Sequence, residues 1–255
     1  MSLEKWIDVS VYSKLGPITI QEFEDFKRLG YSGVVVGSWH GNSVNIFCYR
    51  DLRNALAAGL KIATYIALSP DKPIEYQVQA AYNICCAETP FLWDQLKFVA
   101  VDVEIDGITV GEIQTALDKV KELEGKPCIY TAKWFWEGHL GNPTEFSQVP
   151  LWSADYDDAE SLVFKGKYGG WDSLVGKQYA GTVTLLGIKV DLNVFDTNFT
   201  EDLMDKGVIS TALNSFLTRT RAISNTVGRY ALPGEKDTPE LSAKFRGIRK
   251  SLLED

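Results

Sequence analysis

Phe98-Val99-Ala100-Val101-Asp102-Val103-Glu104 is the stretch of sequence that decides the fold and points to a functional site. Its nearly unbroken apolar run is typical of a strand buried in a parallel sheet. Asp102 and Glu104 stand two residues apart at its end, so such a strand would turn both side chains to one face. Two carboxylates on a buried strand are unfavourable unless they have partners or a task. Hydrolysis of a glycosidic bond requires a carboxyl pair of this kind; the alternative is a strand end with two solvated acids.

Strand-like and helix-like patterns alternate on both sides of this stretch. Continuous apolar strands joined by amphipathic helices predict a parallel sheet covered by helices. A dinucleotide-binding fold is disfavoured, because Gly16-Pro17 does not supply the glycine fingerprint that such a fold carries after its first strand. The expected strands are 6–10, 33–37, 61–68, 96–105 and 127–131, and the expected helices are 18–29, 46–58, 73–87 and 110–123.

The pattern changes after about residue 145, where strand-like runs are joined by glycine-rich loops without obvious helices. These strands are expected at 149–156, 175–180 and 188–195. The chain is therefore predicted to be an α/β protein, a TIM-like barrel that begins as βα units and closes with bare strands. Active sites in such barrels lie at the C-terminal ends of the strands. Four acids are expected near that rim: Asp8, Asp102, Glu104 and Asp191.

Residues 197–255 differ from the predicted barrel of residues 1–196. Their apolar residues recur at helical spacing, and Leu232-Pro233-Gly234 interrupts the pattern. We expect a C-terminal helical hairpin. It either packs on the barrel or serves as a contact for a homo-oligomer or a virion.

Composition and charge exclude several classes of partner. The formal net charge of the 255-residue chain is −8, which gives no general attraction for nucleic acid. No apolar run approaches the ~18 residues of a membrane span. The first residues lack the apolar stretch of a secretory signal, so synthesis in the cytoplasm is expected.

The cysteines and histidines give no sign of a metal centre. Four cysteines show no metal-ligand spacing and lie in or near apolar segments, so buried free thiols are expected. Only two histidines, His40 and His139, are present, and neither lies in a zinc-type pattern. We expect neither a metal nor a cofactor.

Six short motifs, taken in order, resemble those of the family 25 glycoside hydrolases, the Chalaropsis-type lysozymes of bacteria and their phages. The resemblance covers about residues 4–196. It implies an irregular, flattened β/α barrel that hydrolyses the β-1,4 bond between N-acetylmuramic acid and N-acetylglucosamine in peptidoglycan. The matching motifs are Asp8-Val9-Ser10, Asp102-Val103-Glu104, Ile129-Tyr130-Thr131, Leu151-Trp152-Ser153-Ala154-Asp155-Tyr156, Gln178-Tyr179 and Val190-Asp191-Leu192-Asn193-Val194-Phe195.

The sequence departs from the family pattern at positions that border the expected groove. Tyr65 is followed by Ile66-Ala67 where the family usually has His-Phe, and Lys177 replaces a tryptophan before Gln178. Ser38-Trp39-His40-Gly41 stands where an acidic or polar pair is usual. These changes leave the carboxylates in place and affect the expected preference among glycans.

The resemblance implies roles for the four acids. Glu104 is expected to be the general acid, with a pKa raised by a crowded acidic rim. Asp102 is expected to be the ionised partner, orienting the acetamido group of the substrate while its carbonyl attacks the anomeric carbon. Asp8 and Asp191 would hold the site and tune the pKa of Glu104, the alternative being acids that cap loop amides.

Aromatic residues and one amide are expected to bind the glycan. Tyr65, Tyr130, Trp152, Tyr156 and Gln178 are the candidates, with core packing an equal alternative for Tyr130. Trp39 and His40 are expected on a rim loop. The aromatic run 134–136 would either wall the groove or form a short buried helix.

Two other functions remain open at this stage. One is a non-catalytic glycan-binding or virion structural module on the same barrel, and the other is a barrel glycosidase that acts on chitin or a capsular glycan. As a lysozyme, the protein would act on the bacterial cell wall, either as a phage lysin or as a component of a virion.

Overall fold

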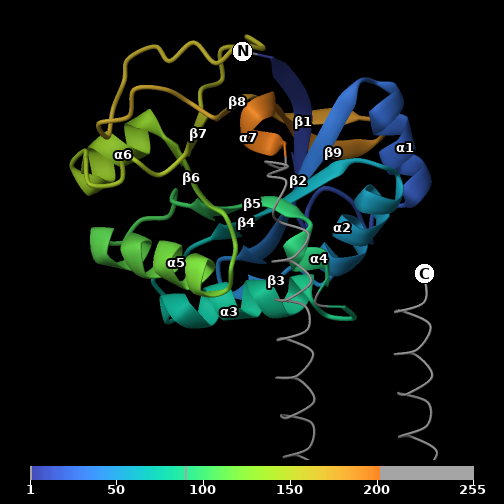
Figure 1. Cartoon of the computed structure of the whole chain (residues 1–255), viewed down its shortest axis with the longest axis horizontal. Helices are drawn as coiled ribbons and strands as arrows, with labels where there is room; N and C mark the ends of the chain where they lie inside the picture. Colours follow the sequence, from blue (N-terminus) through green and yellow to red (C-terminus); the bar gives the residue numbers. More distant parts are fainter. Residues whose placement is uncertain (1, 90, 202–255) are drawn as a thin grey trace, which may run out of the picture. The chain divides into compact units, whose positions relative to one another are not determined.

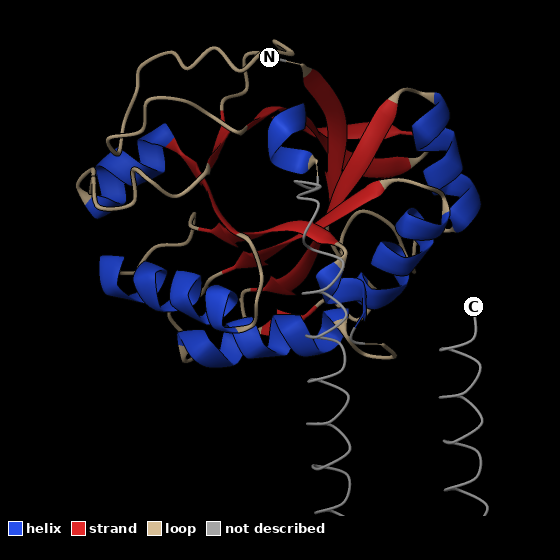
Figure 2. Cartoon of the chain, viewed as in Figure 1, coloured by secondary structure: helices blue, strands red, loops and turns tan. Residues whose placement is uncertain are grey.

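The described part of the chain, residues 2–89 and 91–201 of the computed structural model, contains a closed barrel of eight strands. The strands belong to one sheet of order β1-β9-β8-β7-β6-β5-β4-β2-β3, and pairing of β1 with β2 closes the ring (Figures 1 and 2). The strands are β1 Leu3–Val9, β2 Tyr31–His40, β3 Ser43–Val44, β4 Lys61–Ala67, β5 Leu96–Asp102, β6 Pro127–Ala132, β7 Leu151–Ala154, β8 Gly176–Leu185 and β9 Ile188–Asp196.

Strand direction brings the ends of the barrel strands to one mouth. Neighbouring strands from β1 through β2, β4, β5, β6 and β7 to β8 are parallel. The last strand, β9, is antiparallel to both β8 and β1. The carboxyl ends of the parallel strands therefore share one rim with the first half of β9. This arrangement confirms the predicted α/β barrel.

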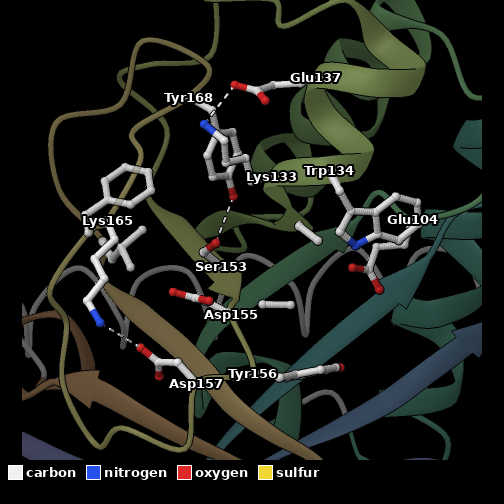
Figure 3. Close-up of a pocket in the computed structure, with 14 residues that line it drawn as sticks. Glu104, Lys133, Trp134, Glu137, Ser153, Asp155, Tyr156, Asp157, Lys165 and Tyr168 are labelled. Atoms are coloured by element: carbon white, nitrogen blue, oxygen red, sulfur yellow. Dashed lines mark hydrogen bonds and ion pairs between the residues drawn. The ribbon is translucent and has the colours of Figure 1, made fainter.

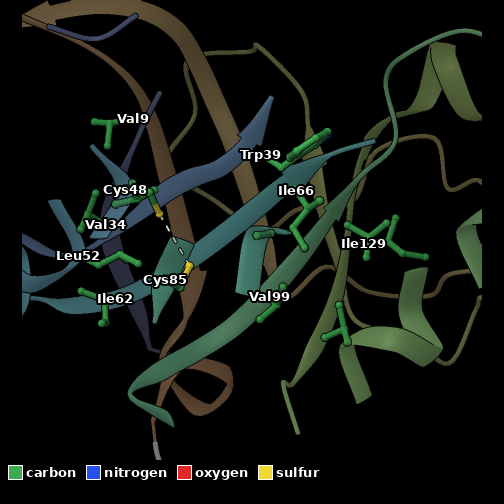
Figure 4. Close-up of a cluster of buried hydrophobic side chains, with 14 of the residues drawn as sticks. Val9, Val34, Trp39, Cys48, Leu52, Ile62, Ile66, Cys85, Val99 and Ile129 are labelled. Carbon is green, nitrogen blue, oxygen red and sulfur yellow. Dashed lines mark hydrogen bonds between the residues drawn. The ribbon is translucent and has the colours of Figure 1, made fainter. Parts of the chain in front are cut away.

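Amphipathic helices cover the outside of β2, β4, β5 and β6 (Figure 1). Local sequence fixes their ends: Thr19 with Glu22 and Thr109 with Glu112 form capping boxes at the starts of α1 and α5. Between helices and strands lies the larger core. There, Leu52 and the hydrogen-bonded free thiols of Cys48 and Cys85 lie beside Val34 and Ile62 (Figure 4). The helices are α1 Ile20–Arg28, α2 Cys48–Ala57, α3 Ile74–Cys85, α4 Phe91–Asp94, α5 Val110–Glu122, α6 Lys133–Leu140 and α7 Thr197–Thr200.

A second, smaller core fills the end of the barrel opposite the mouth, and we call it the floor. It is aromatic: the ring of Phe98 lies 5.9 Å from Trp6, 5.1 Å from Phe195 and 5.2 Å from Phe199 of α7. Room for these rings depends on glycine, because a Cβ on Gly176 would stand 2.3 Å from the Phe195 ring. The floor thus closes the barrel to water from below.

Several predicted elements need correction. The acidic strand ends at Asp102 instead of running to residue 105, so Glu104 lies just beyond it. Trp39 and His40 belong to β2 and not to a loop, because β2 continues along β4 and pairs with β3. Trp39 is buried and its ring meets Tyr76 edge to face. The run 134–136 is helical, since it lies in α6.

Three of the four cysteines, Cys48, Cys85 and Cys128, are buried, Cys86 is partly buried, and all four are free thiols, as expected. None of the described helices is both long enough and apolar enough to cross a membrane. The described barrel includes α7, four residues past the expected boundary at 196. Beyond residue 201 the expected helical hairpin of residues 197–255 lies outside the described residues.

Candidate active site

Strand register brings the four predicted acids to the mouth of the barrel. Asp8 on β1 lies directly opposite Asp191 on β9 in the antiparallel ladder. Asp102 ends β5 beside Tyr130 of β6, and Glu104 follows two residues later. Acids that face one another across a ladder destabilise a sheet, so their grouping at this mouth makes it the candidate active site.

A cavity of about 180 Å³ lies among these acids. Its walls contain all nine residues singled out from the sequence, contributed by β1, β4, β5, β6, β7, β8, β9 and the loops that follow β5 and β7. The nine residues are Asp8, Tyr65, Asp102, Glu104, Tyr130, Trp152, Tyr156, Gln178 and Asp191.

Asp8 is held by two side-chain amides. Its Oδ2 accepts hydrogen bonds of 2.8 Å from Gln178 Nε2 and 2.8 Å from Asn193 Nδ2. The backbone N–H of Thr182 donates to a carboxylate oxygen of Asp191. Buried polar groups are stable only when paired, and these donors satisfy the two acids that face each other.

Aromatic side chains fix the orientation of the two amides. The Gln178 carbonyl oxygen accepts from the hydroxyls of Tyr130 at 2.8 Å and Tyr156 at 2.6 Å. The Trp152 indole N–H donates to Asn193 Oδ1 at 2.9 Å. Trp152 is only 1% exposed, so its ring face is not available as the sugar platform expected from the sequence. Tyr156, at 62% exposed, does present its ring.

Crowding of carboxyls in a partly dry site raises their pKa values. Burial, and then the charge of Asp191, raise the pKa of Glu104 to about 7. Burial and Asp191 likewise raise the pKa of Asp8 to about 7, although its two amide donors work against the rise. Burial, and then the charge of Glu104, raise the pKa of Asp102 well above its usual value. Because neighbouring carboxyls raise one another's pKa, a proton on one of them favours the ionised form of the next.

Two larger cavities flank the acids and extend them into a groove. We call the first the Trp134 arm: about 610 Å³, it shares Glu104 and Tyr156 with the acid cavity and is also lined by Trp134 and Tyr168 (Figure 3). We call the second the Lys189 arm. It measures about 310 Å³, shares Asp8, Tyr65 and Asp191 with the acid cavity, and is also lined by Ser10, Tyr12, Ser13, His40, Thr182 and Lys189.

Sequence reasoning missed some residues of the site. Asn193 was within reach of it, because it stands two residues after Asp191 on one strand and must share its face. Trp134 was expected either to wall the groove or to lie in a short buried helix. It lies in α6 and is 65% exposed. His40 was expected on a loop, and no local signal placed Lys189 at the groove.

Among the residues that the structure describes, no group of three or more His, Cys, Asp or Glu side chains is arranged to hold a metal ion. The acid cavity itself is lined by carboxyl, phenol, indole and amide groups.

The fold and site define a class of protein: a β/α barrel whose functional groups gather at the carboxyl ends of its parallel strands, within a groove open at both sides. The chain belongs to the glycosyl hydrolases family 25, whose model matches residues 7–188. Membership confirms the resemblance inferred from the six motifs and places the protein among the glycoside hydrolases.

Curated relatives come from Dictyostelium discoideum. Probable GH family 25 lysozyme 5 is 29% identical over 187 residues, which are 68% of this chain and 84% of that protein. Probable GH family 25 lysozyme 3 is 39% identical over 84 residues, or 32% of this chain. The match covers only 18% of the length of lysozyme 3.

Solved structures of wall-lytic proteins share the fold. The CTP1L endolysin superposes with a TM-score of 0.59 at 21% identity, covering 77% of this chain and 67% of that one. The autolysin LytC of Streptococcus pneumoniae, solved with a synthetic peptidoglycan ligand, gives 0.56 at 17% identity over 76% of this chain and 47% of LytC. At these identities the likeness concerns the fold alone.

Proposed function

We propose that this protein is a lysozyme-type glycosidase that hydrolyses the β-1,4 bond between N-acetylmuramic acid and N-acetylglucosamine in peptidoglycan. The observation that carries the proposal is the cluster of four carboxyls at the centre of a groove with an arm on either side. An open groove suits a polymer cleaved within its length. Family membership and the names of the relatives, lysozymes, an endolysin and an autolysin, support a wall polysaccharide as substrate.

Glu104 is proposed as the general acid. Protonation of the leaving oxygen requires an acid that still carries its proton near neutral pH, and the pKa of Glu104 is raised to about 7 by burial and by Asp191. Glu104 also lies where the acid cavity meets the Trp134 arm, so its proton can reach a glycosidic oxygen that bridges the two.

Asp102 is proposed as the partner carboxylate. The substrate's acetamido carbonyl oxygen would attack the anomeric carbon as the bond to the leaving oxygen breaks and Glu104 supplies the proton. Asp102 would accept the acetamido N–H and stabilise its growing positive charge. Burial, and after it the charge of Glu104, raise the pKa of Asp102, so a proton on Glu104 removes one of the effects that disfavour the ionised form this role needs.

Water completes the reaction. Glu104, now ionised, would take a proton from a water molecule whose oxygen attacks the anomeric carbon. This attack breaks the bond between the anomeric carbon and the acetamido oxygen, so the acetamido group is regenerated and Glu104 is again protonated. Asp8 and Asp191 are proposed to hold this end of the site, because Asp8 is fixed by two amides and Asp191 raises the pKa values of both Glu104 and Asp8.

The products of peptidoglycan digestion test the proposal. Purified peptidoglycan is incubated with the wild-type protein and with Glu104→Gln, and the new reducing ends are identified after borohydride reduction. Muramic acid ends formed by the wild type alone are expected. Reducing ends of N-acetylglucosamine, or activity confined to chitin or another glycan, would replace the muramidase with a different glycosidase. Binding of peptidoglycan without new ends from either protein would indicate a non-catalytic module.

A further inference from the structure

The Lys189 arm of the groove is lined by one lysine that forms no ion pair within the described structure, although Asp8 and Asp191 also line this arm where it meets the acid cavity. Lys189 is exposed on β9, two residues from Asp191, and its ammonium forms no ion pair with any described residue. Lys189 does not neutralise Asp191 either. Burial raises the pKa of Asp191, and among the described residues the hydrogen bond from the Thr182 N–H is the one interaction that lowers it. His40 lines the same arm, and its exposed ring meets Tyr12 edge to face at 5.1 Å. Its ring nitrogens form no hydrogen bond or ion pair with the described residues.

The Trp134 arm differs in this respect, because both of its lysines are already paired. Lys133 Nζ lies 3.0 Å from Glu137, and Lys165 Nζ lies 3.5 Å from Asp157 (Figure 3). The two arms of one groove therefore offer different chemistry. One has compensated charge beside exposed aromatic rings, and the other has a free ammonium and an imidazole.

The position of Glu104 shows which half of the substrate each arm would take, given the proposed function on which this step rests. A general acid must reach the leaving oxygen. Glu104 lines the Trp134 arm and the acid cavity but not the Lys189 arm. The leaving N-acetylglucosamine then occupies the Trp134 arm, and the muramyl residue faces the Lys189 arm. Muramic acid is the sugar of the pair that carries a lactyl carboxyl group, free or extended by an acidic peptide.

We propose that Lys189 and His40 form a carboxylate-binding site for the muramyl side of the substrate. Lys189 supplies the charge, and His40, which lines the same arm, supplies an N–H donor. The site confers a preference for glycans with acidic substituents over neutral ones such as chitin, and it acts on binding because neither side chain lines the acid cavity. The carboxylate comes either from the lactyl group itself or from the peptide attached to it.

Three preparations of soluble glycan strands test the proposal. The first keeps its peptides, the second has been stripped by an amidase to free the lactyl carboxyls, and in the third these carboxyls are converted to neutral methyl amides. KM is measured for the wild type, and Kd is measured in the Glu104→Gln background, where strands bind without turnover. Lys189→Glu should raise both about tenfold and Lys189→Gln about 2- to 5-fold, on carboxylate-bearing strands only, with kcat unchanged. His40→Phe should weaken binding of the same strands.

The outcomes separate the possibilities. An effect on stripped but not on peptide-bearing strands assigns the lactyl carboxylate, and the reverse assigns the peptide. Equal effects on all three preparations, or none, would overturn the site while leaving the muramidase proposal intact. Absence of turnover in the wild type would overturn the muramidase, and the Kd values would still decide the site. Lys121→Gln, on the exposed end of α5, removes the same charge away from the groove and should match the wild type.

Discussion

The floor and the mouth of this barrel are built from inward-facing residues of the same strands, yet the floor is aromatic and the mouth is acidic. On β1, Trp6 belongs to the aromatic floor and Asp8 to the mouth; on β5 the same holds for Phe98 and Asp102. Every second side chain of a strand points to one face, so both sets point inward at different heights. A dry, close-packed floor gives rigid strands, and rigid strands hold carboxyls in an arrangement that would otherwise relax by repulsion.

Removal of the proposed acid at the mouth should have the largest effect. Glu104→Gln keeps the size of the side chain and abolishes proton donation, so kcat should fall about 10³- to 10⁴-fold with KM little changed. Release of reducing ends from soluble glycan strands measures both. Glu122→Gln, at the exposed end of α5, is the matched control. A loss below tenfold would remove Glu104 from the role of general acid.

Damage to the floor should affect stability instead of chemistry. Phe98→Ala removes a fully buried ring that contacts four other rings, and we expect the free energy of unfolding to fall by about 3–5 kcal/mol. Denaturant unfolding measures this value. Phe91→Ala, at an exposed phenylalanine on α4, should change it by less than about 1 kcal/mol. If Phe98→Ala stays folded but loses turnover, the floor contributes to chemistry as well as to stability, which would contradict this division of roles.

Replacement of the proposed partner carboxylate should have a smaller effect on turnover than loss of the acid. Asp102→Asn keeps the shape of the side chain and removes the charge that would stabilise the acetamido cation, so kcat should fall about a hundredfold or more. Thermal unfolding should show a fold as stable as the wild type or more so, because one of four crowded acids is gone. Near-normal turnover would refute the assigned role.

The pH dependence of stability should be the smallest of the four effects. Glu104 and Asp8 have pKa values raised to about 7 in the folded state, so the folded protein binds more protons than the unfolded chain between about pH 4 and 7. Stability therefore falls as pH rises through this range. We expect the Tm at pH 8 to lie about 5–10 °C below that at pH 5.5.

The double variant Asp8→Asn/Glu104→Gln should flatten this dependence in part. Asp51, buried between α1 and α2 with a pKa raised by burial to about 7, keeps its own contribution. A Tm that rises from pH 5.5 to 8 in the wild type would contradict the crowding of carboxyls at the mouth.

Much of the fold followed from local sequence. Alternation of apolar strands with amphipathic helices and the change of pattern after residue 145 predicted the βα barrel and most element positions. Failures came where tertiary contacts override local signals: β2 runs on through Trp39 because β3 and β4 pair with it, and the strand of Asp102 stops before Glu104.

The sequence by itself determined which residues could do the chemistry, because acids at the ends of apolar strands are conspicuous in a strand pattern of period two. Only the closed barrel decided that Asp8 faces Asp191, that Gln178 and Asn193 converge on one carboxylate oxygen, and that Lys189 stands unpaired on one side of the groove. The physical reason is that periodicity is a property of neighbours in the chain. Strand register and closure depend instead on how every inward-facing side chain packs against residues from the other end of the sequence.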